Sequence, residues 1–189
     1  MFRSVFLKIV LSAILSGCIS IFYIKGQSTF GTRQFISAEK SKGDFPVSAG
    51  GKSTPLLVSS KDWTGVSRAM RDLQTDIGKV TSSLPVLTLD TIPDSHELII
   101  AGTIGKSEII DLLIKNGKID SEKIAGKWES FLIQVVNRPF KGVKRALIVA
   151  GSDKRGTIYG IYEISRQIGV SPWYWWADVP VNKKKNLYA

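Results

Sequence analysis

The sequence predicts an α/β (α+β) fold in which a small mixed β-sheet packs with about three helices. Apolar runs rich in Val, Ile and Leu alternate with amphipathic stretches early in the chain, and two such runs follow one another late. Alternating strands and helices favour parallel pairing, whereas consecutive strands joined by a short turn favour a hairpin. We therefore expect a sheet of mixed direction, with helices on one or both faces.

Residues 1–26 are predicted to be a targeting leader that takes no part in the fold. Arg3 and Lys8 give it a positive start, and the apolar span that follows is short for a membrane-crossing helix of ~20 residues. Within that span, Leu15-Ser16-Gly17-Cys18 resembles a lipobox, with Cys18 as the lipidated residue. A lipoprotein leader, a cleaved secretion signal and an uncleaved anchor all remain open. Each would export the domain: to the periplasm, to the outer membrane as a lipoprotein, or to the medium. Only the lipid anchor or the leader would contact a membrane.

Composition divides the rest of the chain into three segments. Residues 27–53 are rich in Gly, Ser and Lys without a sustained period, and we expect a linker there. Residues 54–182 are the predicted α/β domain. Residues 183–189 are expected to begin a connection to a further domain.

The domain is predicted to begin with a strand over Thr54–Ser59 and a helix over residues 62–80. The proline of the strand suits its start or an edge position. Asp72, Asp76 and Lys79 are expected to lie on the solvated side of the helix. The apolar residues of the helix recur three and four positions apart, as on one buried face: Trp63, Val66, Met70, Leu73, Ile77 and Val80.

The middle of the domain is predicted to hold four strands and one helix. Ser107 suits a helix N-cap, and Asn116-Gly117 suits the end of that helix. A turn between Pro139 and Gly142 makes the last two strands a candidate hairpin. The expected elements are the strands Pro85–Leu89, Glu97–Thr103, Ser130–Asn137 and Lys144–Gly151, and the helix between Ser107 and Asn116.

A second well-marked helix follows the turn at Gly151. Asp153 is placed to cap its start, Gly169 to end it in a left-handed conformation, and Pro172 prevents its resumption. Gly156 and Gly160 are one turn apart, which predicts a close approach of the helix backbone to the sheet. Because no Lys follows Gly156, the spacing of Gly151 and Gly156 does not make a phosphate-binding loop.

Charge and residue counts limit the chemistry. The formal charge is +10, yet Lys and Arg are scattered and no nucleic-acid-binding module is present, so we expect no nucleic-acid partner. The one cysteine, Cys18, lies in the leader, and the one histidine, His96, is expected in a surface loop. Neither favours a metal site, and no cofactor is expected.

Two candidate binding regions stand out. Asp153, Lys154 and Arg155 begin a helix, where exposed amides and the helix dipole can hold a carboxylate or phosphate; capping and domain contact are the simpler alternatives. The run Trp173-Tyr174-Trp175-Trp176 offers flat faces for stacking on sugar rings, with Trp176 as the foremost candidate beside Trp175 and Trp173. Large aromatic side chains equally suit a buried seam between domains.

The run from Gly151 through Tyr162 and on to Pro180 closely resembles the N-terminal domain of glycoside hydrolase family 115, the xylan α-1,2-glucuronidases. The resemblance extends weakly back to about Leu84. It implies an accessory α/β domain that precedes a (β/α)8 barrel, where the inverting acid and base would lie. The barrel is absent from this sequence, so no catalytic residue can be assigned, and glucuronoxylan or its oligosaccharides would be bound through the missing part.

The acidic residues of the chain support the same expectation. Glycoside hydrolysis requires two carboxyl groups that flank the scissile bond, and here the acidic residues lie mostly on helix faces, turns and caps. We expect the chain by itself to be inactive. Three hypotheses follow: the non-catalytic N-terminal portion of an exported glycoside hydrolase, a free-standing exported carbohydrate-binding or adaptor module, or a non-binding structural domain that serves a separately encoded barrel.

Overall fold

The computed structural model describes residues 33–174 and 176–189, of which residues 34–189 belong to one compact unit. The predicted leader with Cys18 and the predicted binding residue Trp175 lie outside the described residues. Within the described ranges, no helix has the length and apolar character needed to cross a membrane.

In the described part of the chain, five strands form the main sheet, in the order β4-β3-β5-β7-β6. β4, β3, β5 and β7 are parallel, and β6 is antiparallel to β7. This confirms the predicted mixed sheet and the predicted hairpin. The strands are β3 Leu56–Val58, β4 Leu87–Leu89, β5 Glu97–Thr103, β6 Phe131–Asn137 and β7 Arg145–Gly151.

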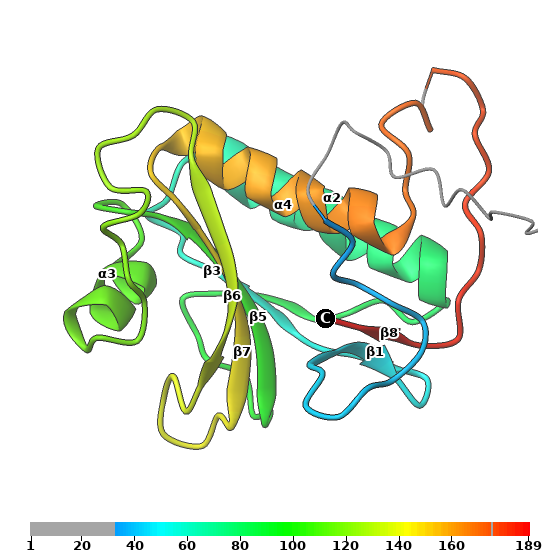
Figure 1. The fold of residues 1–189 in the computed structure, drawn as a ribbon, viewed down its shortest axis with the longest axis horizontal. Coiled ribbons are helices and arrows are strands. Elements are labelled where there is room, and N and C mark those ends of the chain that lie inside the picture. The colour runs from blue at the N-terminus through cyan, green and yellow to red at the C-terminus, as the bar shows by residue number, and fades with distance from the viewer. Residues whose placement is uncertain (1–32, 175) are drawn as a thin grey trace, which may run out of the picture. The chain divides into compact units, whose positions relative to one another are not determined.

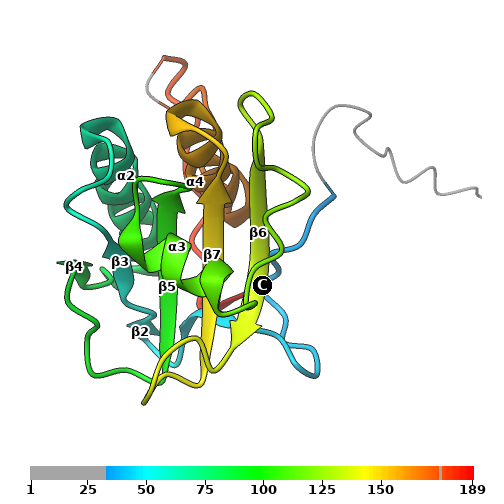
Figure 2. The same cartoon turned by 90° about the vertical axis from the view of Figure 1, so that its left-hand side faces the viewer.

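Helices cover both faces of this sheet. α2 (Thr64–Thr81) and α4 (Lys154–Ile168) lie side by side on one face, and α3 (Glu108–Lys115) lies on the other (Figures 1 and 2). The domain has a hydrophobic core on each face of the sheet, and alternate residues of β5 are buried in one or the other. Ile99 packs toward α2 and α4, and Ile100 packs toward α3. Because side chains of a strand point to opposite faces in turn, the apolar strands supply both cores at once.

The predicted ends of α3 and α4 are confirmed. The carboxylate of Asp153 accepts a hydrogen bond of 2.8 Å from the amide of Gly156, and the hydroxyl of Ser107 accepts one from the amide of Ile110. Gly169 ends α4 with a φ of 107°, which costs little without a Cβ. α2 begins two residues later than predicted, because Asp62 joins the ends of β3 and β5 by accepting a bond of 2.6 Å from the amide of Thr103.

The predicted close approach of α4 to the sheet is also confirmed. A Cβ on Gly160 would lie 2.6 Å from Cγ1 of Val149, and one on Gly156 would overlap the carbonyl of Ser130. The close packing compensates for the helix propensity that each glycine gives up.

The predicted linker over residues 27–53 is wrong for the residues from Gln34 onward. Phe45 and Val47 are fully buried in the core beneath α2 and α4. β1 (Pro46–Ala49) and β2 (Lys52–Ser53) form a hairpin, and both glycines of its turn, Gly50 and Gly51, have positive φ. Ile36 is buried in the same core, so the segment belongs to the packed domain despite its Gly, Ser and Lys content.

The expectation that residues 183–189 only connect to another domain is likewise wrong. β8 (Leu187–Tyr188) pairs with β1 and completes a second sheet in the order β2-β1-β8. Leu187 is fully buried, and Phe45 and Ala189 exchange two backbone hydrogen bonds of 2.7 and 2.8 Å. The burial of Leu187 draws this segment back into the domain.

Candidate functional site

The aromatic turn after α4 presents two indole rings to solvent. Trp173 is 65% exposed and Trp176 is 85% exposed. The turn is held by its backbone, in which the amide of Trp176 donates to the carbonyl of Trp173 over 3.0 Å. Neither ring is covered by the rest of the domain, so both are accessible to a sugar or to another domain.

Tyr174, between them, points the other way. Its ring packs against the core formed with α2 and α4. The ammonium of Lys79 on α2 lies 4.3 Å from the centroid of this ring, which is close enough for a cation–π interaction. Tyr174 therefore anchors the turn to α2.

At the start of α4, the three residues proposed as an anion site already make contacts within the domain. One oxygen of Asp153 caps the helix, and the other accepts a bond of 2.8 Å from the amide of Glu129. These two backbone bonds hold the pKa of the Asp153 carboxyl below its usual value. Arg155 forms an ion pair of 2.7 Å with Glu129, and Lys154 lies 5.9 Å from the ring centroid of Trp63. These contacts favour capping, and anion binding stays a prediction.

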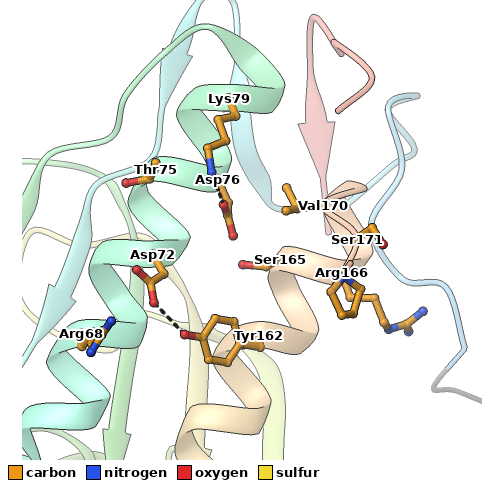
Figure 3. Close-up of a pocket in the computed structure, with 11 residues that line it drawn as sticks. Arg68, Asp72, Thr75, Asp76, Lys79, Tyr162, Ser165, Arg166, Val170 and Ser171 are labelled. Atoms are coloured by element: carbon orange, nitrogen blue, oxygen red, sulfur yellow. Dashed lines mark hydrogen bonds and ion pairs between the residues drawn. The ribbon is translucent and has the colours of Figure 1, made fainter. Parts of the chain in front are cut away.

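A groove of about 720 Å³ lies between α2 and α4, on the side of the helices that faces away from the sheet. Most of the residues that line it have polar or charged side chains, and Figure 3 shows side chains of both helices pointing toward one another across it. The lining residues are Arg68, Asp72, Thr75, Asp76 and Lys79 from α2, Tyr162, Ser165 and Arg166 from α4, and Val170, Ser171 and Pro172 beyond α4.

Hydrogen bonds and ion pairs fix several of these side chains. The hydroxyl of Tyr162 donates a hydrogen bond of 2.6 Å to Oδ2 of Asp72, and Lys79 lies 3.4 Å from Oδ1 of Asp76. Partial burial first, and then the bond to Asp72, raise the pKa of Tyr162 to about 12, because a partly desolvated phenolate beside a carboxylate is unfavourable. Arg166 makes two bonds, of 2.8 and 2.6 Å, to Glu163.

Ser165 is the exception among the polar groups of the groove. The residue is only 4% exposed, and its hydroxyl has no hydrogen-bond partner among the described residues. In Figure 3 its side chain points from α4 into the groove. A buried hydroxyl without a partner is unusual in a folded protein.

This groove corrects the expectation that Asp72, Asp76 and Lys79 lie on a solvated helix face. Asp76 is in fact buried, and all three line the groove. The spacing of apolar residues in one helix reveals which of its own faces is buried. It does not reveal which second helix will pack beside it. The available signal was the hydroxyl of Ser165, which is spaced one turn from Ile161 and Ile168 on the buried face of α4.

The other residues considered for chemistry are not brought together into a reactive site within the described part of the chain. His96 is exposed, with Nδ1 3.4 Å from the carbonyl of Gly142. Across residues 33–174 and 176–189 no group of three or more His, Cys, Asp or Glu residues could hold a metal ion. In the groove both carboxylates come from α2, and α4 contributes none to the lining.

Comparison of the sequence with family models and with curated proteins finds no match. Among solved structures, the chain is similar to BtGH115A, a family GH115 4-O-methyl-α-glucuronidase with specificity for decorated arabinogalactans. The identity is 36% and the TM-score 0.57, over 77% of this chain and 17% of that chain. A second structure, CpGH84D, aligns with 12% identity and a TM-score of 0.44, over 82% of this chain and 22% of that one, and carries no argument.

The chain thus spans less than a fifth of the length of BtGH115A. The match confirms the predicted resemblance to the N-terminal domain of glycoside hydrolase family 115, and the α+β fold expected from that resemblance. It relates the chain to a glycoside hydrolase.

Proposed function

We propose that this relative of the family 115 glycoside hydrolases is the non-catalytic N-terminal portion of an exported α-glucuronidase. The observation that carries the proposal is the 36% identity to BtGH115A over 77% of the chain. The whole enzyme would remove (4-O-methyl)glucuronic acid from xylan with inversion. Because BtGH115A has specificity for decorated arabinogalactans, such a glycan is the second substrate to test.

The distribution of carboxylates supports a non-catalytic role. An inverting glycosidase holds its two carboxyl groups on opposite sides of the scissile bond, roughly 6.5–9.5 Å apart. In the groove, Asp72 and Asp76 stand on the same helix, and Tyr162 is bonded to one of them. The carboxylate of Asp153 is occupied by two backbone amides.

The test is an assay of the purified chain on glucuronoxylan and on decorated arabinogalactan oligosaccharides. We expect no release of (4-O-methyl)glucuronic acid from either. Release that is lost when a carboxylate within residues 54–189 is changed would refute the non-catalytic role. The DNA that follows the codon for Ala189 offers a second test, since a continuing or frameshifted barrel-like sequence supports the proposal.

The exposure of Trp173 and Trp176 favours one alternative, a free-standing exported carbohydrate-binding or adaptor module. Isothermal titration of the chain with the same oligosaccharides separates the two functions. In a binding module, Trp176→Ala should weaken binding at least tenfold, because stacking area is lost. An accessory domain whose tryptophans contact the catalytic barrel should show no such binding.

Export is part of the proposal and rests on the leader alone. Expression of the full chain in a bacterial host, followed by fractionation, tests it. Labelling with a fatty-acid analogue that depends on Cys18 would identify a lipoprotein, whereas loss of the first residues without label would identify a cleaved signal.

A further inference from the structure

We infer that the groove between α2 and α4 binds a neutral, hydroxyl-rich ligand the size of one or two sugar residues, and that Ser165 bonds one of its hydroxyls. The inference does not depend on the proposed function. It rests on three features of the groove: an unpartnered hydroxyl, a matched set of donors and acceptors, and a balance of charge.

The unpartnered hydroxyl is the feature that indicates a ligand. Ser165 is more than nine-tenths buried and lines the groove, yet its Oγ has no partner in the described part of the chain. A serine in a helix can return its proton to the carbonyl one turn earlier. Ser165 instead points toward α2 (Figure 3). Its Oγ is buried, so a ligand in the groove would receive this hydrogen bond once the neighbouring side chains of the wall shift.

The opposite wall supplies acceptors and a donor for the same ligand. Tyr162 fixes Asp72 through Oδ2, so the other oxygen of this carboxylate is oriented and accepts no hydrogen bond within the described residues. Arg68, one turn before Asp72 on the same helix, adds a guanidinium at the end of the groove. The carboxylate of Asp72 can accept a hydrogen bond from one hydroxyl, and the guanidinium of Arg68 can donate one to another. This pair suits two neighbouring hydroxyls of a sugar ring.

The charges argue against an ionic ligand. Along α2, Arg68 and Lys79 flank Asp72 and Asp76, and Arg166 is already bonded to Glu163. A carboxylate or phosphate that reached Arg68 would also approach Asp72, and a cation would approach Lys79. A neutral polyol can use both signs of charge without repulsion, because a hydroxyl both donates and accepts.

The size and the apolar part of the groove agree with one or two sugar residues. Its volume of about 720 Å³ lies within the usual range for small-molecule sites, roughly 300–1,000 Å³. Val170, Pro172 and the half-exposed ring of Tyr162 give it apolar surface. The C–H face of a pyranose would rest there while its hydroxyls face Asp72 and Ser165.

The test is an NMR titration of the full-length, ¹⁵N-labelled chain with methyl β-D-xylopyranoside, methyl β-D-galactopyranoside and sodium D-glucuronate. We expect saturable shifts of the amides around Asp72 and Ser165 with at least one neutral glycoside, at a Kd in the millimolar range or below. Glucuronate should bind at least tenfold more weakly. Absence of saturable shifts with both neutral glycosides, or tighter binding of glucuronate, would overturn the inference.

Matched variants assign the binding to the groove. Ser165→Ala should weaken binding about fivefold or more, as expected for one lost hydrogen bond, while Ser67→Ala, on α2 but outside the groove lining, should not. Tyr162→Phe should weaken it by releasing Asp72, whereas Tyr159→Phe removes an exposed hydroxyl of the same helix and should not. The spectrum of each variant shows whether it is folded. Unchanged affinity in both folded groove variants would place the ligand elsewhere and refute the assignment.

Discussion

The hydroxyl of Tyr162 on α4 lies 2.6 Å from Oδ2 of Asp72 on α2, ninety positions earlier in the chain. This bond joins the outer sides of two helices whose inner sides are already joined through the core. It also sets the orientation of a carboxylate in the groove. One bond thus contributes both to the packing of the domain and to the shape of its polar groove.

The first prediction concerns alkaline pH. The folded chain holds the Tyr162 proton to about pH 12, whereas an unfolded chain releases it near pH 10. The stabilisation by Tyr162 is therefore complete below about pH 10 and is lost as pH rises toward 12. Across that window the free energy of unfolding should fall more steeply for the unmodified chain than for Tyr162→Phe. Urea unfolding at several pH values measures this, with Tyr159→Phe as the control. Equal slopes would contradict it.

A second prediction follows from the hydroxyl of Ser165. Removing a buried group that has no partner relieves its desolvation cost, so Ser165→Ala should raise the free energy of unfolding by about 1 kcal/mol. Urea unfolding without ligand measures the change. Ser107→Ala is the contrasting variant, because this buried serine caps α3 and its loss should cost about 1 kcal/mol. Equal destabilisation by both would show that Ser165 has a partner.

The third prediction compares two helix glycines. Gly160→Ala should destabilise the domain by about 1–3 kcal/mol, because its Cβ would meet Val149 and the ring of Phe131. Gly65→Ala in α2 would meet only the flexible end of Ile158, at 3.2 Å, so the gain in helix propensity should make it neutral or stabilising. Thermal unfolding of the two variants distinguishes them. A stable Gly160→Ala would mean that α4 can move away from the sheet.

The fourth prediction tests the role of β8. Leu187→Ala should cost about 2–5 kcal/mol, because the side chain is fully buried with Phe45 and Val47. Leu112→Ala removes the same atoms from an exposed position on α3 and should change the free energy of unfolding by no more than about 0.5 kcal/mol. Denaturant unfolding compares them. Equal effects would indicate that residues 187–189 add nothing to the core.

Much of the fold could be predicted from local chemistry. Asp153 and Gly169 mark the ends of α4 because an N-cap and a left-handed C-cap depend on single residue types. β5 was predicted at Glu97–Thr103, where the structure has it, because an uninterrupted apolar run is typical of a buried strand. These features require no knowledge of distant contacts.

The elements that were missed depend on pairing across the whole chain. β1 and β8 are only four and two residues long, so only their contact with each other reveals them as strands. The groove was missed for a similar reason, since Asp72 and Tyr162 meet only after α2 and α4 have packed side by side. Trp173 and Trp176 were predicted to be functional, and their exposure agrees with contact either to a sugar or to another domain.

The pairing of β1 with β8 also determines how the domain would respond to mechanical tension. Ser37 bridges Tyr188, and Phe45 is bonded to Ala189, so the segments that enter and leave the compact unit lie against each other at one end of an antiparallel pair. Pulling these two segments apart would load their hydrogen bonds one pair at a time, as in a zipper, rather than all together in shear. The hydrogen bonds of the small sheet would therefore be loaded before those of the five-stranded sheet.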